Sequence, residues 1–198
     1  MKKIVLAGIV GGLILWIWGF ISWVVLPLHT AAERPIPNES EIAETLARAL
    51  PEKGVYLFPM MPQETADMSP AGQEAAMTAY VAKFQAGPHG RIFFDPAGGD
   101  PFMVNQMISG LLIFMLSASI VAWLLSRSTA AGESFLSRVV YCGMIGTLIA
   151  VGCYLSEWNW MGYSFDWTRA LMFDSIVAWL LAGIGISAIV KQKATAAM

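Results

Sequence analysis

The sequence predicts an α-helical integral membrane protein with four transmembrane helices and a small extracytoplasmic α/β unit between the first two of them. Of its 198 residues, 57% are hydrophobic and only 13% are charged, against about 25% charged residues in ordinary soluble domains. The charged residues leave long apolar runs, and a helix needs about 20 residues to cross the hydrocarbon core of a bilayer. Four runs come close to this length or exceed it: 4–26, 104–125, 139–156 and 170–190.

The first run, 4–26, follows Lys2 and Lys3, contains no charged residue and ends before Pro27. A secretory signal peptide has a shorter apolar region, of about 7 to 15 residues. We therefore expect this run of 23 residues to stay in the protein as a membrane anchor. Cleavage after Ala32, where small residues stand, is the alternative.

The basic residues near the helix ends predict the orientation, because Lys and Arg in short loops beside transmembrane helices stay in the cytoplasm. If both termini are cytoplasmic, six basic residues lie on that side: Lys2, Lys3, Arg127, Arg138, Lys191 and Lys193. The segment 27–103 then lies outside, with five basic residues against ten acidic ones. We interpret the chain as a multi-pass protein of the bacterial cytoplasmic (inner) membrane. Its first helix occupies 1–26, a periplasmic unit 27–103, and three further helices 104–198.

The segment 27–103 carries the signals of a helix, a strand, a second helix and a second strand. Asn38 with Glu41 three residues later is a helix-capping pattern, and Ser69 followed by proline starts a second helix. The runs 55–58 and 91–94 are aromatic and β-branched, which is typical of strands. Two strands bury little apolar surface, so we expect this unit to depend on the helix ends or on a partner protein.

Several kinds of chemistry lack their usual residues. The only histidines are His29 and His89, both in the predicted outer segment, so no predicted helix offers an imidazole to a haem or to a Ser-His protease pair. The chain has no Cys-x-x-Cys, no His-Glu-x-x-His and no phosphate-binding glycine loop, and no motif assigns it to a characterised family. We therefore expect no enzyme activity, no cofactor, no metal ion and no nucleic-acid partner.

Asp174 is the one acid within an apolar run, and ionisable residues inside a membrane are candidates for function. If the fourth helix starts near Ala170, this carboxylate lies about one turn in, where the helix N-terminus favours an anion. Two interpretations follow: a ligand or ion site in an outer polar vestibule, or simple helix-end polarity, which the shallow depth favours. The weak ligand or ion candidates are Asp174, Asn105, Gln106, Glu157, Asp166 and Arg169.

Small residues predict where helices pack closely. Cys142 and Cys153 are eleven positions apart, almost three helical turns, so both fall on one face, beside Gly146. Small side chains let helix backbones approach, and we expect packing rather than thiol chemistry. The predicted packing residues are Gly8, Gly12, Cys142, Gly146, Cys153 and Gly183.

Aromatic residues crowd the last predicted outer loop as Trp158, Trp160, Tyr163, Phe165 and Trp167. Aromatic side chains of this kind are enriched at the membrane interface, and an interfacial belt is the interpretation that we favour. The alternative is that they form the wall of a pocket.

Three classes of function remain. We favour a non-enzymatic accessory or structural subunit, a scaffold of a larger membrane assembly that contacts the lipid bilayer and either a membrane-protein partner or further copies of itself. A small transporter or channel with an outer polar vestibule around Asp174 is the alternative. Metal handling at the outer face, with thioether ligands from Met60, Met61 and Met68 and a histidine, is a third.

Overall fold

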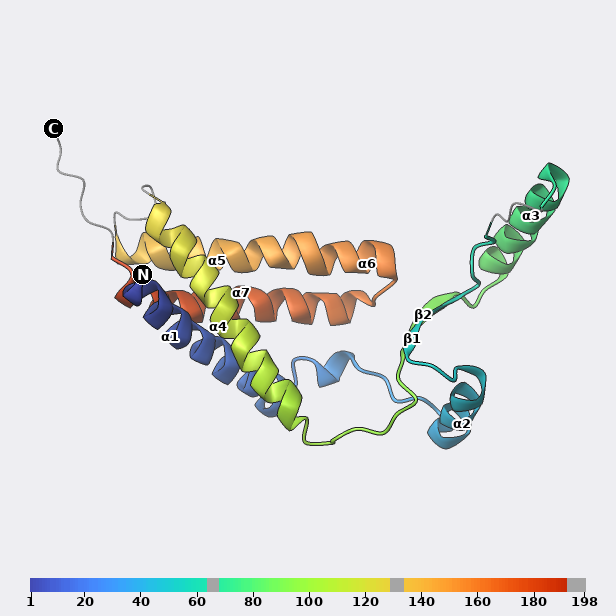
Figure 1. Cartoon of the computed structure of the whole chain (residues 1–198), viewed down its shortest axis with the longest axis horizontal. Coiled ribbons are helices and arrows are strands. Elements are labelled where there is room, and N and C mark those ends of the chain that lie inside the picture. The colour runs from blue at the N-terminus through green and yellow to red at the C-terminus, as the bar shows by residue number, and fades with distance from the viewer. Residues whose placement is uncertain (64–67, 129–133, 192–198) are drawn as a thin grey trace. The chain divides into compact units, whose positions relative to one another are not determined.

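The computed structural model describes residues 1–63, 68–128 and 134–191, and it is mostly helical (Figure 1). Lys193, one of the six flanking basic residues, lies outside the described residues. The chain forms two compact units. The first, here called the bundle, comprises Met1–Arg34 and Asp100–Met198, and the second, here called the α/β unit, comprises Pro35–Gly99.

Four helices of the bundle are long and apolar enough to span a membrane, as predicted. These spans are Lys2–Val25, Val104–Arg127, Phe135–Met161 and Phe165–Ile189. The second span is α4 and the fourth is α7. The first consists of α1 (Lys2–Phe20) and the π-helical segment η1 (Ile21–Val25), and the third of α5 (Phe135–Ile149), the π-helical η4 (Ala150–Leu155) and α6 (Ser156–Met161).

Small residues bring these helices together. Helix α1 packs against both α4 and α7, and α5 packs against α7. A side chain at Gly12 would collide with the backbone of Met115 on α4, and one at Gly11 would meet Ile186 on α7. The core between the helices contains Leu15, Leu125 and Ile186, together with several alanines.

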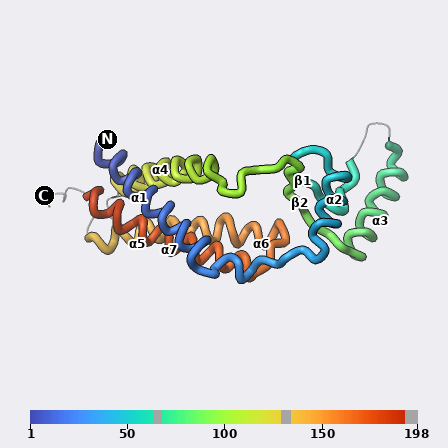
Figure 2. Tube along the Cα trace, turned by 90° about the horizontal axis from the view of Figure 1, so that it is seen from below, coloured from blue at the N-terminus to red at the C-terminus, as the bar shows by residue number. Residues whose placement is uncertain are grey.

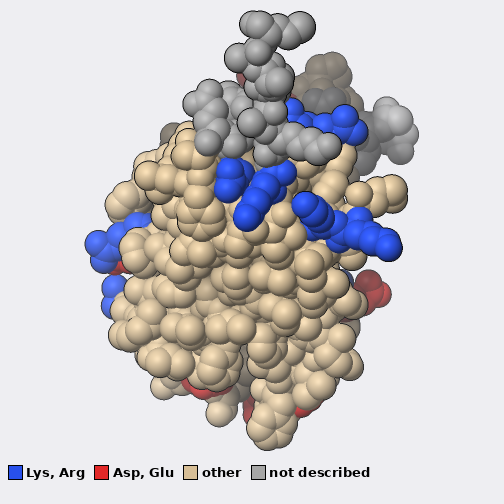
Figure 3. Space-filling view, turned by 90° about the vertical axis from the view of Figure 1, so that its left-hand side faces the viewer, with Lys and Arg blue, Asp and Glu red and all other residues tan. Residues whose placement is uncertain are grey.

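The two ends of the bundle differ in composition. The start of α1 and the end of α7 lie at the same end of the bundle (Figure 2). Lys and Arg side chains gather there (Figure 3), and we call it the basic end. Its described residues are Lys2, Lys3, Arg127, Arg138 and Lys191. We call the other end, where α6 meets α7, the aromatic end, because it holds Trp158, Trp160, Tyr163, Phe165 and Trp167.

The α/β unit contains the two predicted strands, which form a two-stranded sheet. Strand β1 (Gly54–Phe58) pairs antiparallel with β2 (Gly90–Phe94), with Tyr56 opposite Ile92. The prediction that these two runs form strands is confirmed, and the strands pair with each other. The strands alternate along the chain with two helices, α2 (Glu39–Ala49) and α3 (Pro70–Ala86).

The two helices of this unit begin differently. Ser69 caps α3 as predicted, because its Oγ accepts a hydrogen bond from the backbone N–H of Gly72 at 3.2 Å. Asn38 precedes α2, but its side chain makes no capping hydrogen bond. Side-chain caps normally have an extended backbone, whereas Asn38 is left-handed, with φ of 54°.

Candidate functional site

The site begins with the start of α7, which lies five residues before the predicted start at Ala170. The Oγ of Ser164 accepts a hydrogen bond from the backbone N–H of Trp167 at 3.3 Å, which caps the helix, and Asp166 in the first turn complements the helix dipole. Asp174 is therefore nine residues into α7. At 1.5 Å per residue this is about 13 Å from the start of the helix.

The prediction that Asp174 lies one turn into its helix is therefore wrong. The favourable effect of a helix N-terminus on an anion fades within the first turn. Helix-end polarity no longer explains why an acid stands at this position. The carboxylate has to be understood from its neighbours deeper in the bundle.

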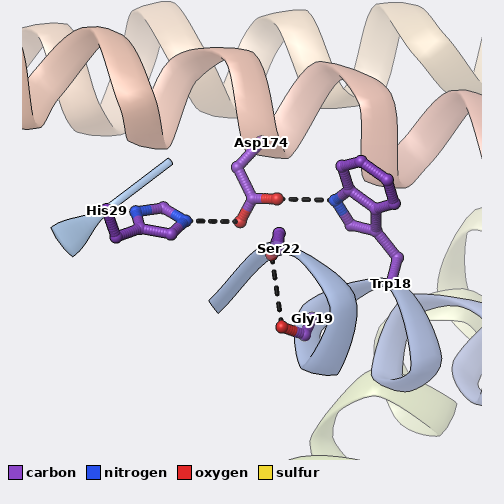
Figure 4. Close-up of polar contacts among 5 residues, drawn as sticks. All are labelled: Trp18, Gly19, Ser22, His29 and Asp174. Atoms are coloured by element: carbon purple, nitrogen blue, oxygen red, sulfur yellow. Dashed lines mark hydrogen bonds and ion pairs between the residues drawn. The ribbon is translucent and has the colours of Figure 1, made fainter. Parts of the chain in front are cut away.

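Two side chains from the first span and its extension hold Asp174 (Figure 4). The indole Nε1–H of Trp18 donates a hydrogen bond to Oδ1 of Asp174 at 2.5 Å. The imidazole Nε2 of His29 lies 3.5 Å from Oδ2. The Asp174 side chain is 16% exposed and that of His29 is 0% exposed. The carboxylate thus joins the last span to the first.

His29 is fixed by aromatic contacts rather than by hydrogen bonds. Its ring stacks on Trp23, with 3.8 Å between ring centroids and 9° between ring planes, and meets the edge of Trp167 at 5.9 Å. Within the described part of the chain, neither ring nitrogen of His29 makes a hydrogen bond. His29, which we expected in the outer segment, therefore belongs to the bundle, where its buried imidazole lies beside the carboxylate of Asp174.

A cavity of about 280 Å³ opens beside this group, and Asp174 lines it. All four spans contribute to its wall. The lining side chains that carry polar or aromatic groups are Trp18, Trp23, Phe114, Ser117, Tyr154, Asp174, Ser175 and Trp179. The cavity is thus lined by a single carboxylate and by several aromatic rings.

Two π-helical segments border the cavity. Trp23 belongs to η1 and Tyr154 to η4, and both side chains line the space. Such segments widen a helical turn and are frequent at functional sites. Cys142 is buried and Cys153 is exposed. Cys153 lies within η4, where the α-helical repeat that predicted a common face for the two cysteines no longer applies.

The other predicted ligand residues do not line this cavity. Asn105 and Gln106 are exposed at the start of α4, and Gln106 lines a separate apolar cavity of about 460 Å³. Asp166 and Arg169 form an exposed ion pair with 3.1 Å between charged atoms, and both line a third cavity of about 420 Å³. Glu157 is half-buried on α6.

The predicted packing residues, Cys153 apart, lie at contacts inside the bundle. A side chain at Gly8 would collide with Ser119 of α4, and one at Gly183 would meet Cys142 at 2.7 Å. One at Gly146 would lie 2.7 Å from the carbonyl oxygen of Ser175. Much of the small-residue surface is thus used within this chain.

The residues at the aromatic end divide between the two interpretations. Trp160 is 75% exposed, as expected of an interfacial belt. Trp167 instead turns toward His29 and Trp23, so it supports the wall around Asp174. Only one of these five aromatic residues therefore contacts the site through a ring interaction found in the described residues.

The described residues give little support to metal binding or to nucleophilic catalysis. No group of three or more His, Cys, Asp or Glu converges there as metal ligands do. His89 stacks on Phe84, and Met60 and Met61 are exposed. In the same part of the chain no hydroxyl or thiol is hydrogen-bonded to His29, as nucleophilic catalysis would need.

No protein family, no curated protein and no solved structure matches this chain. Function therefore has to be argued from the chemistry of the site. That chemistry is an acid within a membrane span, held by one indole N–H, next to a cavity.

Proposed function

We propose that this protein is a non-enzymatic, multi-pass membrane protein that binds a small cation at Asp174 and works as a small transporter or channel. The observation that carries this proposal is the place of the carboxylate, nine residues into α7 and on the wall of a cavity of about 280 Å³. Its only hydrogen bond or ion-pair partners among the described residues are Trp18 and His29.

The charge on Asp174 supports a cationic ligand. An ionised acid within a membrane is costly unless a partner compensates it, and such residues mark the pathways of ions and substrates. Trp18 donates one hydrogen bond but carries no charge, and an ionised Asp174 beside a neutral His29 would leave one negative charge at the site. A cation in the cavity would compensate that charge.

The orientation remains part of the proposal. The described basic residues of the basic end, with Lys2 and Arg127 among them, favour a cytoplasmic position for that end by the positive-inside rule. In a bacterial inner membrane the aromatic end and the Asp174 cavity would then face the periplasmic half of the bilayer.

A calorimetric titration tests this proposal. The full chain in lipid nanodiscs is titrated at constant ionic strength with sodium, potassium and tetramethylammonium chlorides. At least one of these cations should bind, and Asp174→Asn should remove that binding while the protein still inserts. Asp166→Asn, on the same helix but exposed and paired with Arg169, is the control that should keep it. Equal binding by Asp174→Asn, or no binding of any cation, would contradict the proposal.

A second candidate, the accessory or scaffolding subunit, is favoured by a different observation. None of the described residues of the α/β unit is buried, and Val55 and Phe93 are more than half exposed. Such apolar surface suits contact with a membrane-protein partner, another copy of the chain or the lipid surface. Gentle detergent purification followed by mass spectrometry tests it, because a partner in fixed stoichiometry is then expected.

A further inference from the structure

We infer that the cavity beside Asp174 takes an organic ammonium, a cation whose charge is surrounded by carbon, rather than a bare metal ion. This inference rests on the proposed cation site and adds the chemical class of its ligand. Three features carry it: the aromatic wall, the small number of oxygen ligands and the size of the space.

Five of the residues that line the cavity are aromatic. A cation over the face of a tryptophan, tyrosine or phenylalanine ring is attracted by the negative charge of that face, and tryptophan is the best of the three. Quaternary ammonium ligands are recognised by cages of such rings. Here the rings and the carboxylate that line the cavity are Trp18, Trp23, Phe114, Tyr154, Trp179 and Asp174.

The same wall offers few side-chain oxygen atoms for a calcium or magnesium ion. Calcium takes six to eight oxygen ligands in proteins, and magnesium requires near-octahedral geometry. The side-chain oxygens here are those of Asp174, Ser117, Tyr154 and Ser175. The hydroxyl of Ser175 already donates to the carbonyl oxygen of Gly146 at 3.2 Å, and one oxygen of Asp174 accepts from Trp18. An ammonium with apolar substituents needs no such coordination shell.

The size of the cavity fits a ligand with several heavy atoms. Its volume of about 280 Å³ corresponds to roughly nine water molecules at about 30 Å³ each. Asp174 is 16% exposed, so the carboxylate can be reached from the cavity. The ammonium could belong to a lipid headgroup or to a free amine, and both present the same chemistry to Asp174.

The test compares choline with 3,3-dimethyl-1-butanol, a neutral molecule of the same shape. Titrations use the full chain in nanodiscs of phosphatidylglycerol, which carries no ammonium. Choline should bind, and the neutral analogue should not compete with it. Asp174→Asn should weaken choline binding about 30-fold or more, as loss of a buried charge partner does.

A ring variant tests the aromatic part separately. Trp179→Phe keeps an aromatic ring but lowers its attraction for a cation, and should weaken choline about 3- to 10-fold. Trp160→Phe, 75% exposed and outside the cavity, is the matched control and should leave the affinity unchanged. Thermal melts of each variant show whether it is folded. Equal affinity of Trp179→Phe and Trp160→Phe would overturn the inference.

The remaining outcomes separate this inference from the proposed function. Binding of sodium, potassium or protons but not of choline would leave the cation site standing and overturn the ammonium. Binding of the neutral analogue as tightly as choline would also overturn it, and no cation binding at all would overturn both.

Nanodiscs containing phosphatidylethanolamine identify the source of the ammonium. Competition with choline by this lipid, and its recovery with wild-type protein but not with Asp174→Asn, would support a headgroup. Undiminished choline binding in these nanodiscs would support a free amine. Both results support the ammonium class.

Discussion

The bundle and the α/β unit differ in how much of their apolar surface is buried. In the bundle, Leu125, Cys142 and Ile186 are fully buried between helices that approach at glycines. In the α/β unit no described residue is buried, and the two-stranded sheet exposes Val55 and Phe93. A membrane helix satisfies its own backbone hydrogen bonds and can leave apolar side chains to lipid, whereas a small unit in water needs a core.

Polar groups show the same contrast. The bundle buries His29, Ser22, Thr168 and Ser187 with no exposed surface, although water is scarce in a membrane. The α/β unit places its ion pairs, Lys53 with Asp95 and Arg48 with Glu44, at the surface. Among the described residues, buried polar side chains are thus found only in the bundle, where we propose the functional site.

The largest effect is expected when the two regions are separated. Residues 35–99 expressed alone should show no cooperative thermal transition, because so small a unit, with no buried residue among those described, gains too little from apolar burial. Circular dichroism and proton NMR of the fragment measure this. The whole chain with 35–99 replaced by a flexible linker is the control, and its bundle should still melt cooperatively in detergent. A cooperative melt of the fragment would show that the α/β unit is self-sufficient.

The next effect is an all-or-none difference in labelling between the regions. In a background of Cys142→Ala and Cys153→Ser, which removes the native thiols, Gln73→Cys should react with a membrane-impermeant thiol reagent applied from outside. Ser128→Cys, near the end of α4, should not react until the membrane is opened. The reverse pattern would overturn the orientation. The exposed Cys153 makes this background necessary.

A smaller effect is expected from adding a methyl group where two helices of the bundle approach closely. A Cβ at Gly146 would lie 2.7 Å from the carbonyl oxygen of Ser175 and 3.1 Å from the Cα of Ile176, and backbone cannot move aside easily. Gly146→Ala should therefore lower the free energy of unfolding by about 1–3 kcal/mol. Gly110→Ala, which would meet nothing within 4 Å, should raise it by up to about 1 kcal/mol. Unfolding in mixed micelles measures both, and equal costs would mean that Gly146 is not a tight contact.

The smallest effect concerns the surface ion pair between Lys53 and Asp95 in the α/β unit. The hydrogen bond from Lys53 at 2.7 Å, and a second from the backbone N–H of Ala97, hold the pKa of Asp95 below its ordinary value of 3.8. The same bond raises the pKa of Lys53 above 10.5. The stabilisation by Asp95 is therefore complete above pH 3.8 and is lost as pH falls through its lowered pKa. The part from Lys53 is complete below pH 10.5 and is lost as pH rises through its raised pKa.

Carbon-13 NMR of the Asp95 carboxyl in the full chain measures this. The titration midpoint should lie below 3.8 and move upward in Lys53→Gln. An unchanged midpoint in that variant would show that the pair does not form in solution. Because both side chains are largely exposed, stability itself should change little.

The four spans and the two strands could be predicted from the sequence, since both follow from local patterns. Apolar runs of bilayer length predict helices, and short β-branched and aromatic runs predict strands. The start of α7 was missed, although Ser164 with Asp166 in the first turn is a capping signal that could have located it. Because α7 begins five residues earlier than predicted, Asp174 lies well beyond the first turn of the helix. This position favours a binding site over helix-end polarity.

The site itself could be predicted only in part. Asp174 stands out in the sequence as an acid in an apolar run, but its partners are 156 and 145 positions away along the chain, at Trp18 and His29. The contact with His29 requires the chain after Val25 to turn back onto the bundle, which no periodicity encodes. The π-helical segments η1 and η4 likewise leave no pattern that a regular helical repeat would reveal.

The measurement that tests the central claim most directly is the ligand-dependent stability of the full chain and of Asp174→Asn. A ligand that binds only the folded protein, supplied at about 100 times its dissociation constant, stabilises it by about 2.7 kcal/mol. We predict that tetramethylammonium raises the melting temperature of the wild type and of Asp166→Asn equally, and leaves that of Asp174→Asn unchanged. An equal rise in Asp174→Asn would contradict a cation site at this carboxylate.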